Sequence, residues 1–304
     1  QRQMCIRDRY KIEAFDGKVL TVTEWAPEGE VKGIVQISHG MVEYSLRYAE
    51  LARRLNEKGY LVFADDHRAH GETDKDNLGY SEGDIFEKTL KDLYGLTQRY
   101  KEAYPDKKLV FFGHSYGSFL TQAYIQRYHL HDGVVIGGSA KMSGLMSLGG
   151  KLVSSLGCAF KGERAAAELM NTMTFSAYNK KFTEGNFVTS IPAEAERYLA
   201  DPYCSFVCSY NFYKSFMSGL RKLYTKEGLS KVDKNKPMLI ISGAKDPVGG
   251  CGKDTTKLWE MYKKLGVKDL AFKLLPNTRH EYFNDVEREE AYETFIGFVE
   301  RVTE

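Results

Sequence analysis

The chain has 304 residues, of which 42% are hydrophobic and 28% are charged, and its formal net charge is +2. This balance excludes a disordered chain, and the near-neutral charge argues against a nucleic-acid partner, which would need a strongly basic patch. The length allows one large domain that carries a sizeable insertion. No run of 18 or more apolar residues occurs in the sequence, so we expect no membrane span.

The cysteines do not suggest a disulfide framework. They are Cys5, Cys158, Cys204, Cys208 and Cys251, an odd number without CxxC spacing. We therefore expect a reducing, cytoplasmic location. Cys204 and Cys208 stand four residues apart and could share a helix face, but no matching Cys or His pair lies nearby to complete a metal site. We expect both thiols to lie in the core.

The N-terminal segment is set apart from the fold. The sequence MCIRDR at residues 4–9 looks like translated sequencing-adapter sequence of the kind found in metagenome-derived genes. We interpret residues 1–9 as a non-native N-terminal segment and leave them out of the fold prediction.

Predicted strands and helices alternate along the first part of the chain. Residues 10–25 alternate in polarity and turn at Asp16-Gly17, which predicts a β-hairpin. Further strands are predicted at residues 32–38, 60–64, 108–112 and 133–136, and helices at residues 48–55, 85–104 and 118–128. The strands are continuous apolar runs, which is typical of a parallel sheet buried on both faces.

This alternation stops after Ala140. The next strand is predicted at residues 238–242, and the gap is far longer than an ordinary crossover of about 10–30 residues. A helix, a strand and a closing helix follow at residues 258–265, 271–275 and 288–302. We therefore predict an α/β core of residues 10–140 and 236–304, with a mostly parallel central sheet flanked by helices. Residues 141–235 are predicted to form an inserted, mainly helical cap.

A nucleophilic serine is indicated between a strand and a helix. Residues 113–117 have the sequence Gly-His-Ser-Tyr-Gly and fit the GxSxG pattern. In this context the serine sits on a strained strand-to-helix turn that exposes its hydroxyl, and the glycines let the backbone pack closely. The N-terminus of the following helix favours developing negative charge. Ser115 is therefore the predicted nucleophile.

A serine hydroxyl needs a general base within hydrogen-bond reach. Of the seven histidines, only His129, His131 and His280 follow Ser115. The first two lie on or just after the helix that follows the serine, too close to swing over the strand ends. His280 follows the predicted strand at residues 271–275, where the base of such an enzyme is expected.

The orienting acid is predicted from its place after a strand. Asp246 follows the strand at residues 238–242 through a glycine and precedes Pro247, which together favour a tight loop. Asp233 precedes that strand and so lies at the wrong end of the sheet. Asp254 is further along, near a helix start, where a capping role is the simpler interpretation.

The tetrahedral oxyanion of acyl transfer needs two fixed N–H donors, and losing one costs roughly 100- to 1,000-fold in rate. The backbone N–H of Tyr116, directly after the nucleophile, supplies one. The second is expected from the loop after the strand at residues 32–38, and we assign it to Met41.

A dense charged loop at residues 66–70, with the sequence DHRAH, follows a strand. Its residue types suit a metal, but no third and fourth ligand are evident. We predict instead an ion-pair network that braces the neighbouring loops, and we expect Glu43 and Arg47 to join it.

Five motifs in this order resemble a known family. They lie at residues 38–48, 66–71, 113–118, 243–249 and 279–281, and the cap segment at residues 201–206 is similar to bacterial members. On these motifs, residues 10–302 resemble the monoacylglycerol lipase and lysophospholipase branch of the α/β-hydrolases, also called the serine aminopeptidase S33-type hydrolases. The resemblance implies an α/β-hydrolase fold, a triad of Ser115, Asp246 and His280, and Met41 and Tyr116 as oxyanion donors.

The chain departs from the family pattern at four positions. Val42, Tyr44 and Leu46 replace the usual Gly, His and Gly of the oxyanion loop, and Ala69 replaces a usual Gly. The bulkier residues beside the oxyanion loop bear on the shape of the acyl pocket and leave the triad intact.

The cap is expected to set specificity. Residues 142–160 form an apolar stretch with Met and Leu side chains that would either suit an acyl chain or dock the cap onto the core. We assign Leu145, Met146, Leu148 and Val248 to the substrate-binding wall. Many aromatic residues follow at positions 175–216, and a few of them are expected to line an apolar pocket over Ser115.

These features predict a serine carboxylic ester hydrolase that needs no metal or organic cofactor. Its expected substrates are monoacylglycerols, lysophospholipids or other small acyl esters, with transient lipid-surface contact through the cap. One alternative is an aminopeptidase or amidase, which would need an acidic group in the cap, and Glu194 and Glu196 are available. A second alternative is a non-catalytic lipid-binding or partner-binding homologue.

Overall fold

The computed structural model describes residues 8–142, 144–184 and 186–304. In this part of the chain an eight-stranded sheet has the order β1-β2-β4-β3-β5-β6-β7-β8. The strands are β1 (Asp8–Glu13), β2 (Val19–Trp25), β3 (Gly33–Ser38), β4 (Tyr60–Asp65), β5 (Leu109–His114), β6 (Gly133–Gly137), β7 (Met238–Gly243) and β8 (Leu270–Leu275). Strands β1, β2 and β4 pair antiparallel, and the neighbours from β4 to β8 are parallel.

Helices cover both faces of the sheet, and others lie beyond it. The helices of the described residues are α1 (Ala49–Glu57), α2 (Ile85–Ala103), α3 (Tyr116–Tyr124), α4 (Gly144–Lys161), α5 (Glu168–Asn171), α6 (Ala177–Asn179), α7 (Pro192–Ala200), α8 (Tyr210–Leu223), α9 (Lys226–Ser230), α10 (Lys253–Leu265) and α11 (Arg288–Thr303). Alternate residues of a strand point to opposite faces. Val35 therefore joins the cluster under α1 and α11, whereas Ile34 joins the cluster under α2, α3 and α10.

The predicted fold class is confirmed: the protein has an α/β-hydrolase fold with a mostly parallel sheet flanked by helices. The hairpin at Asp16-Gly17 is also confirmed by the antiparallel pairing of β1 and β2. The segment that we set aside is partly included in the sheet, because Asp8 and Arg9 pair with Glu24 and Thr23. Residues 1–7 lie outside the described residues.

Helices α3 and α10 differ most from the prediction, and α3 also ends at Tyr124, four residues before its predicted end. Helix α3 begins at Tyr116, because the backbone turns sharply at Ser115, the residue before it. Helix α10 begins at Lys253, five residues before the predicted start, after Gly252 in a left-handed conformation with φ of 84°. A glycine tolerates this conformation without steric cost, so the chain enters the helix earlier than the apolar periodicity indicates.

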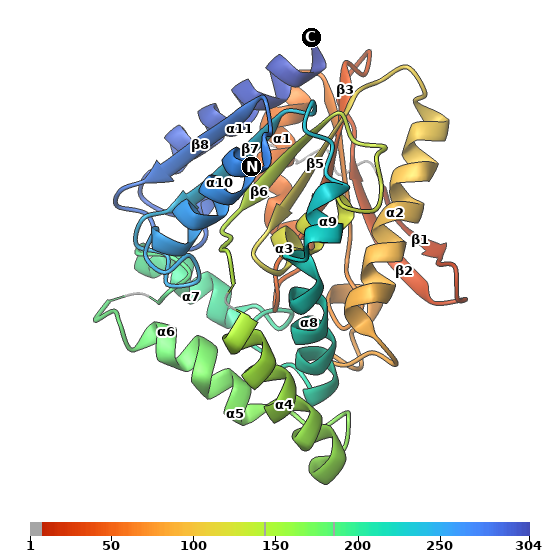
Figure 1. Ribbon diagram of the computed structural model, residues 1–304. Helices are drawn as coiled ribbons and strands as arrows, with labels where there is room; N and C mark the ends of the chain where they lie inside the picture. Colours follow the sequence, from red (N-terminus) through yellow and green to blue (C-terminus); the bar gives the residue numbers. More distant parts are fainter. Residues whose placement is uncertain (1–7, 143, 185) are drawn as a thin grey trace.

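Helices α4 to α9 fall between β6 and β7 in the sequence. Helices α4, α5 and α6 lie at one end of the molecule, beyond the strands of the sheet (Figure 1). Helix α8 packs against α4 and also against the core helices α2 and α3. Cys204 and Cys208 do not share a helix face, because both precede α8 in irregular backbone, but both are buried as expected.

Candidate active site

Ser115 lies on the sharp turn between β5 and α3. Its backbone has φ of 53° and ψ of −118°, a conformation that an L-residue adopts only under strain. Both flanking glycines are required by close packing. A methyl group at Gly117 would lie 1.9 Å from the Ser38 carbonyl oxygen, and one at Gly113 would lie 2.2 Å from that of Gly117. The turn is therefore pressed against the end of β3, and the serine is held above the sheet.

His280 and Asp246 are brought together from the loops after β8 and β7. His280 Nδ1 lies 2.8 Å from Asp246 Oδ2, and the backbone N–H of Val248 donates to Asp246 Oδ1 at 2.8 Å. The carboxylate fixes the tautomer with the proton on Nδ1, which leaves Nε2 as the acceptor. Burial opposes protonation of the ring, but the Asp246 carboxylate outweighs it, so the pKa of His280 lies above its usual value.

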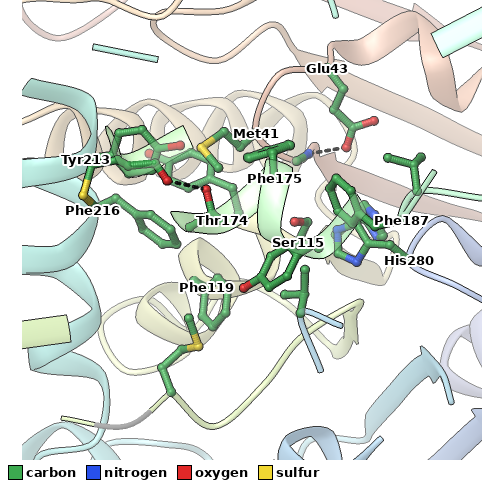
Figure 2. Close-up of a pocket in the computed structure, with 18 of the residues that line it drawn as sticks. Met41, Glu43, Ser115, Phe119, Thr174, Phe175, Phe187, Tyr213, Phe216 and His280 are labelled. Atoms are coloured by element: carbon green, nitrogen blue, oxygen red, sulfur yellow. Dashed lines mark hydrogen bonds between the residues drawn. The ribbon is translucent and has the colours of Figure 1, made fainter. Parts of the chain in front are cut away.

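One cavity of about 170 Å³ is lined by most of the predicted site residues. Ser115, His280, Met41, Tyr116 and Val248 all line it, and the close-up shows Ser115 beside His280 (Figure 2). Parallel strands that end at the same edge of the sheet place residues so distant in sequence at one site.

The four residues assigned to the substrate-binding wall divide into two pairs. Met146 and Val248 line the cavity. Leu145 and Leu148 are not among the residues that line it, and both are exposed to solvent. On a helix, neighbouring residues point in different directions, so an apolar stretch cannot all face one cavity.

Sequence reasoning missed much of the cavity wall. Six of the nine methionines line the cavity, and Met170, Met173 and Met217 were not predicted. The unusual concentration of methionine in the cap was a signal that could have found them. Aromatic side chains complete the wall, among them Phe119, Phe175, Tyr178, Phe187, Tyr198, Tyr213 and Phe216.

The loop after β3 is fixed by a buried carboxylate. Glu43 Oε1 accepts a hydrogen bond from the Gly40 N–H at 2.5 Å and another from the Tyr48 hydroxyl at 2.8 Å. The backbone N–H groups of Met41 and Tyr116 donate to no group among the described residues. Both are therefore free to bind an oxygen of a ligand.

Glu43 and Arg47 do not join the charged loop at residues 66–70, which corrects the prediction. Arg47 instead lies between Glu43, at 3.4 Å, and Glu281, with which it forms a closer ion pair. Glu43 and Glu281 line the cavity, next to the catalytic candidates. Burial, reinforced by the charge of Glu281, raises the pKa of Glu43 to about 7.

The loop at residues 66–70 forms the predicted ion-pair network. The Arg68 guanidinium donates to Asp92 and Asp16, with Nε 2.6 Å from Asp92 Oδ2. Asp66 accepts hydrogen bonds from Arg9 and from the N–H and hydroxyl of Ser45. Within the described ranges, no group of three or more His, Cys, Asp or Glu side chains is arranged to hold a metal ion.

Two of the departures from the family pattern lie at strained positions. Val42 and Ala69 both have positive φ, of 55° and 71°. A glycine would adopt this conformation without cost, whereas a side chain there costs roughly 1–2 kcal/mol. Both positions thus have the left-handed backbone conformation that favours a glycine.

Helix α4 exposes an apolar stripe. Its members recur every three or four residues and are Leu145, Leu148, Leu152, Leu156 and Phe160. Among the helices of the described residues, none is long and apolar enough to cross a bilayer.

Comparison with known proteins shows to which family the chain belongs. A model of the family described as serine aminopeptidase, S33, matches residues 29–287. The monoacylglycerol lipase of Mycolicibacterium smegmatis is 23% identical over 295 residues, which cover 93% of each chain. The monoglyceride lipase of Rattus norvegicus is 33% identical over 106 residues, which are 35% of this chain and 34% of that protein. The chain thus matches about a third of the length of that relative.

Solved structures share the whole fold. A thermostable carboxyl esterase from Bacillus coagulans, in complex with glycerol, is 25% identical with a TM-score of 0.87, covering 98% of this chain and 99% of that one. A soluble variant of monoglyceride lipase from Saccharomyces cerevisiae has a TM-score of 0.78 at 21% identity, covering 100% of this chain and 98% of that one. On the family match, which spans most of its length, the chain belongs to the serine aminopeptidase S33 family of α/β-hydrolases.

Proposed function

We propose that the protein is a serine carboxylic ester hydrolase with Ser115, His280 and Asp246 as its triad. The observation that carries the proposal is the 2.8 Å bond between His280 and Asp246, at a cavity that also contains a serine on a strained turn. Ser115 Oγ attacks the ester carbonyl while His280 takes its proton. The N–H groups of Met41 and Tyr116 stabilise the oxyanion. His280 then protonates the leaving alcohol, and water releases the acid from Ser115.

The substrates that we propose are monoacylglycerols, lysophospholipids or similar small acyl esters. A wall of methionine and aromatic side chains suits an acyl chain, since methionine adapts its shape to an irregular apolar ligand. Glu43 and Glu281 give the same cavity a polar corner that could accept hydrogen bonds from hydroxyl groups of the leaving alcohol. The names of the relatives, monoacylglycerol lipase and carboxyl esterase, support this substrate class.

The cap would contact the lipid surface that holds such substrates. The apolar stripe of α4 offers large aliphatic side chains to that surface, and the exposed Lys141 and Lys161 flank the helix at its two ends. Cationic side chains beside an apolar helix face favour an anionic lipid surface.

A chain-length series of monoacylglycerols and nitrophenyl esters tests the function, with Ser115→Ala as the control. We expect turnover by the wild-type protein and a loss of at least about 10³-fold in the variant. Equal activity of the two proteins would rule out the mechanism.

The aminopeptidase alternative keeps one structural argument. Two carboxylates, Glu43 and Glu281, line the cavity and could hold an amino group, although Arg47 already pairs with both. Glu194 and Glu196, the acidic groups that the sequence offered, do not line the cavity, and Glu194 pairs with Arg197 and Arg288. Turnover of aminoacyl amides above that of acyl esters would favour this alternative.

A further inference from the structure

The residue before the candidate base holds a part of the cap. Arg279 Nη1 donates to three backbone carbonyls, those of Glu184 at 2.7 Å, Asn186 at 2.7 Å and Thr189 at 3.0 Å. The same guanidinium lies over the Phe182 ring, 3.9 Å from its centroid. The Arg279 side chain of the core is therefore hydrogen-bonded to three backbone carbonyls of the cap.

Residues 186–190, which we call the latch segment, form hydrogen bonds with the loop that carries His280. The backbone N–H groups of His280 and Glu281 donate to the carbonyls of Phe187 at 3.3 Å and Val188 at 2.7 Å. The Thr189 hydroxyl donates to the Asn284 carbonyl at 2.7 Å. The latch segment and the His280 loop thus form one hydrogen-bonded unit.

Asp285 links the latch segment to the backbone of Arg279. Its Oδ1 accepts from the Ser190 N–H at 3.0 Å and from the Ser190 hydroxyl, and its Oδ2 accepts from the Arg279 N–H at 2.7 Å. Asp285 is fully buried, so these bonds are shielded from water.

The latch segment also forms part of the wall of the candidate catalytic cavity. Phe187 and Val188 line it, and the Phe187 ring centroid lies 5.6 Å from that of His280 (Figure 2). A movement of the latch segment would therefore change both the pocket wall and the position of the imidazole.

We propose that Arg279 is a positioning residue, which through the latch segment holds His280 in register with Ser115 and so couples the cap to the chemistry. This inference rests on the proposed hydrolase function. Arginine suits the role because its planar guanidinium stacks on the Phe182 ring while Nη1 donates to the carbonyls, whereas the ammonium of a lysine has no flat face to stack. A displacement of a catalytic group by about 1 Å can cost about 100-fold in rate.

The test compares Arg279→Ala, Arg279→Lys and wild type on a short and a long substrate, nitrophenyl acetate and a long-chain nitrophenyl ester. An acetyl group is too small to depend on the pocket wall, so its kcat reports the position of His280. We expect Arg279→Ala to lower kcat for the acetate by about 10- to 100-fold, and Arg279→Lys to lower it less. A role in the pocket wall alone would raise KM for the long ester and leave kcat for the acetate unchanged.

Arg288→Ala is the matched control. Arg288 also joins the core to the cap, through Glu194 at 3.7 Å, but its side chain is 48% exposed and forms no hydrogen bond or ion pair with the latch segment in the described structure. We expect its kcat to stay within about twofold of wild type. Thermal unfolding of each variant shows whether it is folded, and Arg279→Lys serves as the test protein if Arg279→Ala is not.

The outcomes separate this inference from the proposed function. If wild type hydrolyses both esters and a folded Arg279 variant keeps the wild-type kcat for the acetate, the positioning role is wrong. If wild type hydrolyses neither ester, the proposed function itself is wrong, whatever the variants do.

Discussion

In the mechanism that we propose, the chemistry of the site depends on one buried hydrogen bond. Asp246 is fully buried and bonds His280, and this contact holds the imidazole proton on the nitrogen away from Ser115. The serine is ready to react only while the opposite nitrogen of His280 is free to accept its proton. On this proposal, we expect the protonation of His280 to set the activity.

The first prediction concerns pH. The pKa of His280 is raised above its ordinary value of about 6.5, chiefly by Asp246 against the effect of burial. A raised pKa means that His280 is already protonated, and inactive, at a pH where an ordinary histidine would be neutral. We expect kcat/KM to fall as the pH drops through a value above about 6.5, measured on a soluble ester. A fall in kcat/KM whose midpoint lies at or below pH 6.5 would contradict the assignment of His280 as the base.

The second prediction removes the orienting acid. Asp246→Asn keeps the shape of the side chain but cannot hold the same histidine tautomer, so we expect kcat to fall by about 10⁴-fold. Asp254→Asn is the control, since Asp254 is a partly exposed residue that pairs with Lys257 at 2.7 Å. Similar losses in both variants would show that Asp246 has no special role.

At the scale of elements, the charged loop after β4 connects the β1–β2 hairpin to α2. Arg68 is 2% exposed and lies between Asp16 of the hairpin turn and Asp92 of α2. Burial raises the pKa of Asp92 to about 6, although Arg68 opposes this. The three elements are thus joined through one buried cation.

We therefore predict that Arg68→Ala lowers the free energy of unfolding by about 3–5 kcal/mol, because it leaves a buried carboxylate unpaired. The loss should be larger at pH 8 than at pH 5, since a protonated Asp92 costs less to bury. Urea denaturation measures both. Arg127→Ala, which removes a partly exposed pair with Glu87, should cost about 1 kcal/mol or less. Equal losses in the two variants would refute this account of the loop.

The elements of the core were predictable because their signals are local. Apolar runs such as residues 60–64 and 108–112 indicate buried parallel strands without knowledge of their neighbours. The positions of Ser115, Asp246 and His280 followed from strands that end at the same edge. The residues that line the cavity could not be predicted in this way. Whether Leu145 or Met146 faces the cavity depends on how α4 packs against α8, and no local pattern encodes that.

At the scale of the molecule, the cap that we propose has two different faces. Its inner face supplies methionine and aromatic side chains to the cavity, and the outer face of α4 exposes the apolar stripe. A monomeric protein seldom exposes a contiguous apolar patch without a use for it.

The double variant Leu152→Ser/Phe160→Ser tests the use that we propose for the stripe. We expect weaker binding to anionic lipid vesicles and a several-fold lower rate on a monoacylglycerol held in those vesicles, with an unchanged rate on nitrophenyl acetate. Leu199→Ser, at an exposed site on α7, is the control. An unchanged rate and unchanged vesicle binding in the double variant would exclude α4 as the lipid-contacting face.

The most direct test of the central claim is covalent labelling by a fluorophosphonate, followed by mass spectrometry and by the residual esterase rate. The account predicts one label per chain on Ser115, a loss of activity in proportion to labelling, and no label on Ser115→Ala. Full labelling elsewhere, or undiminished hydrolysis by a protein labelled at Ser115, would contradict it.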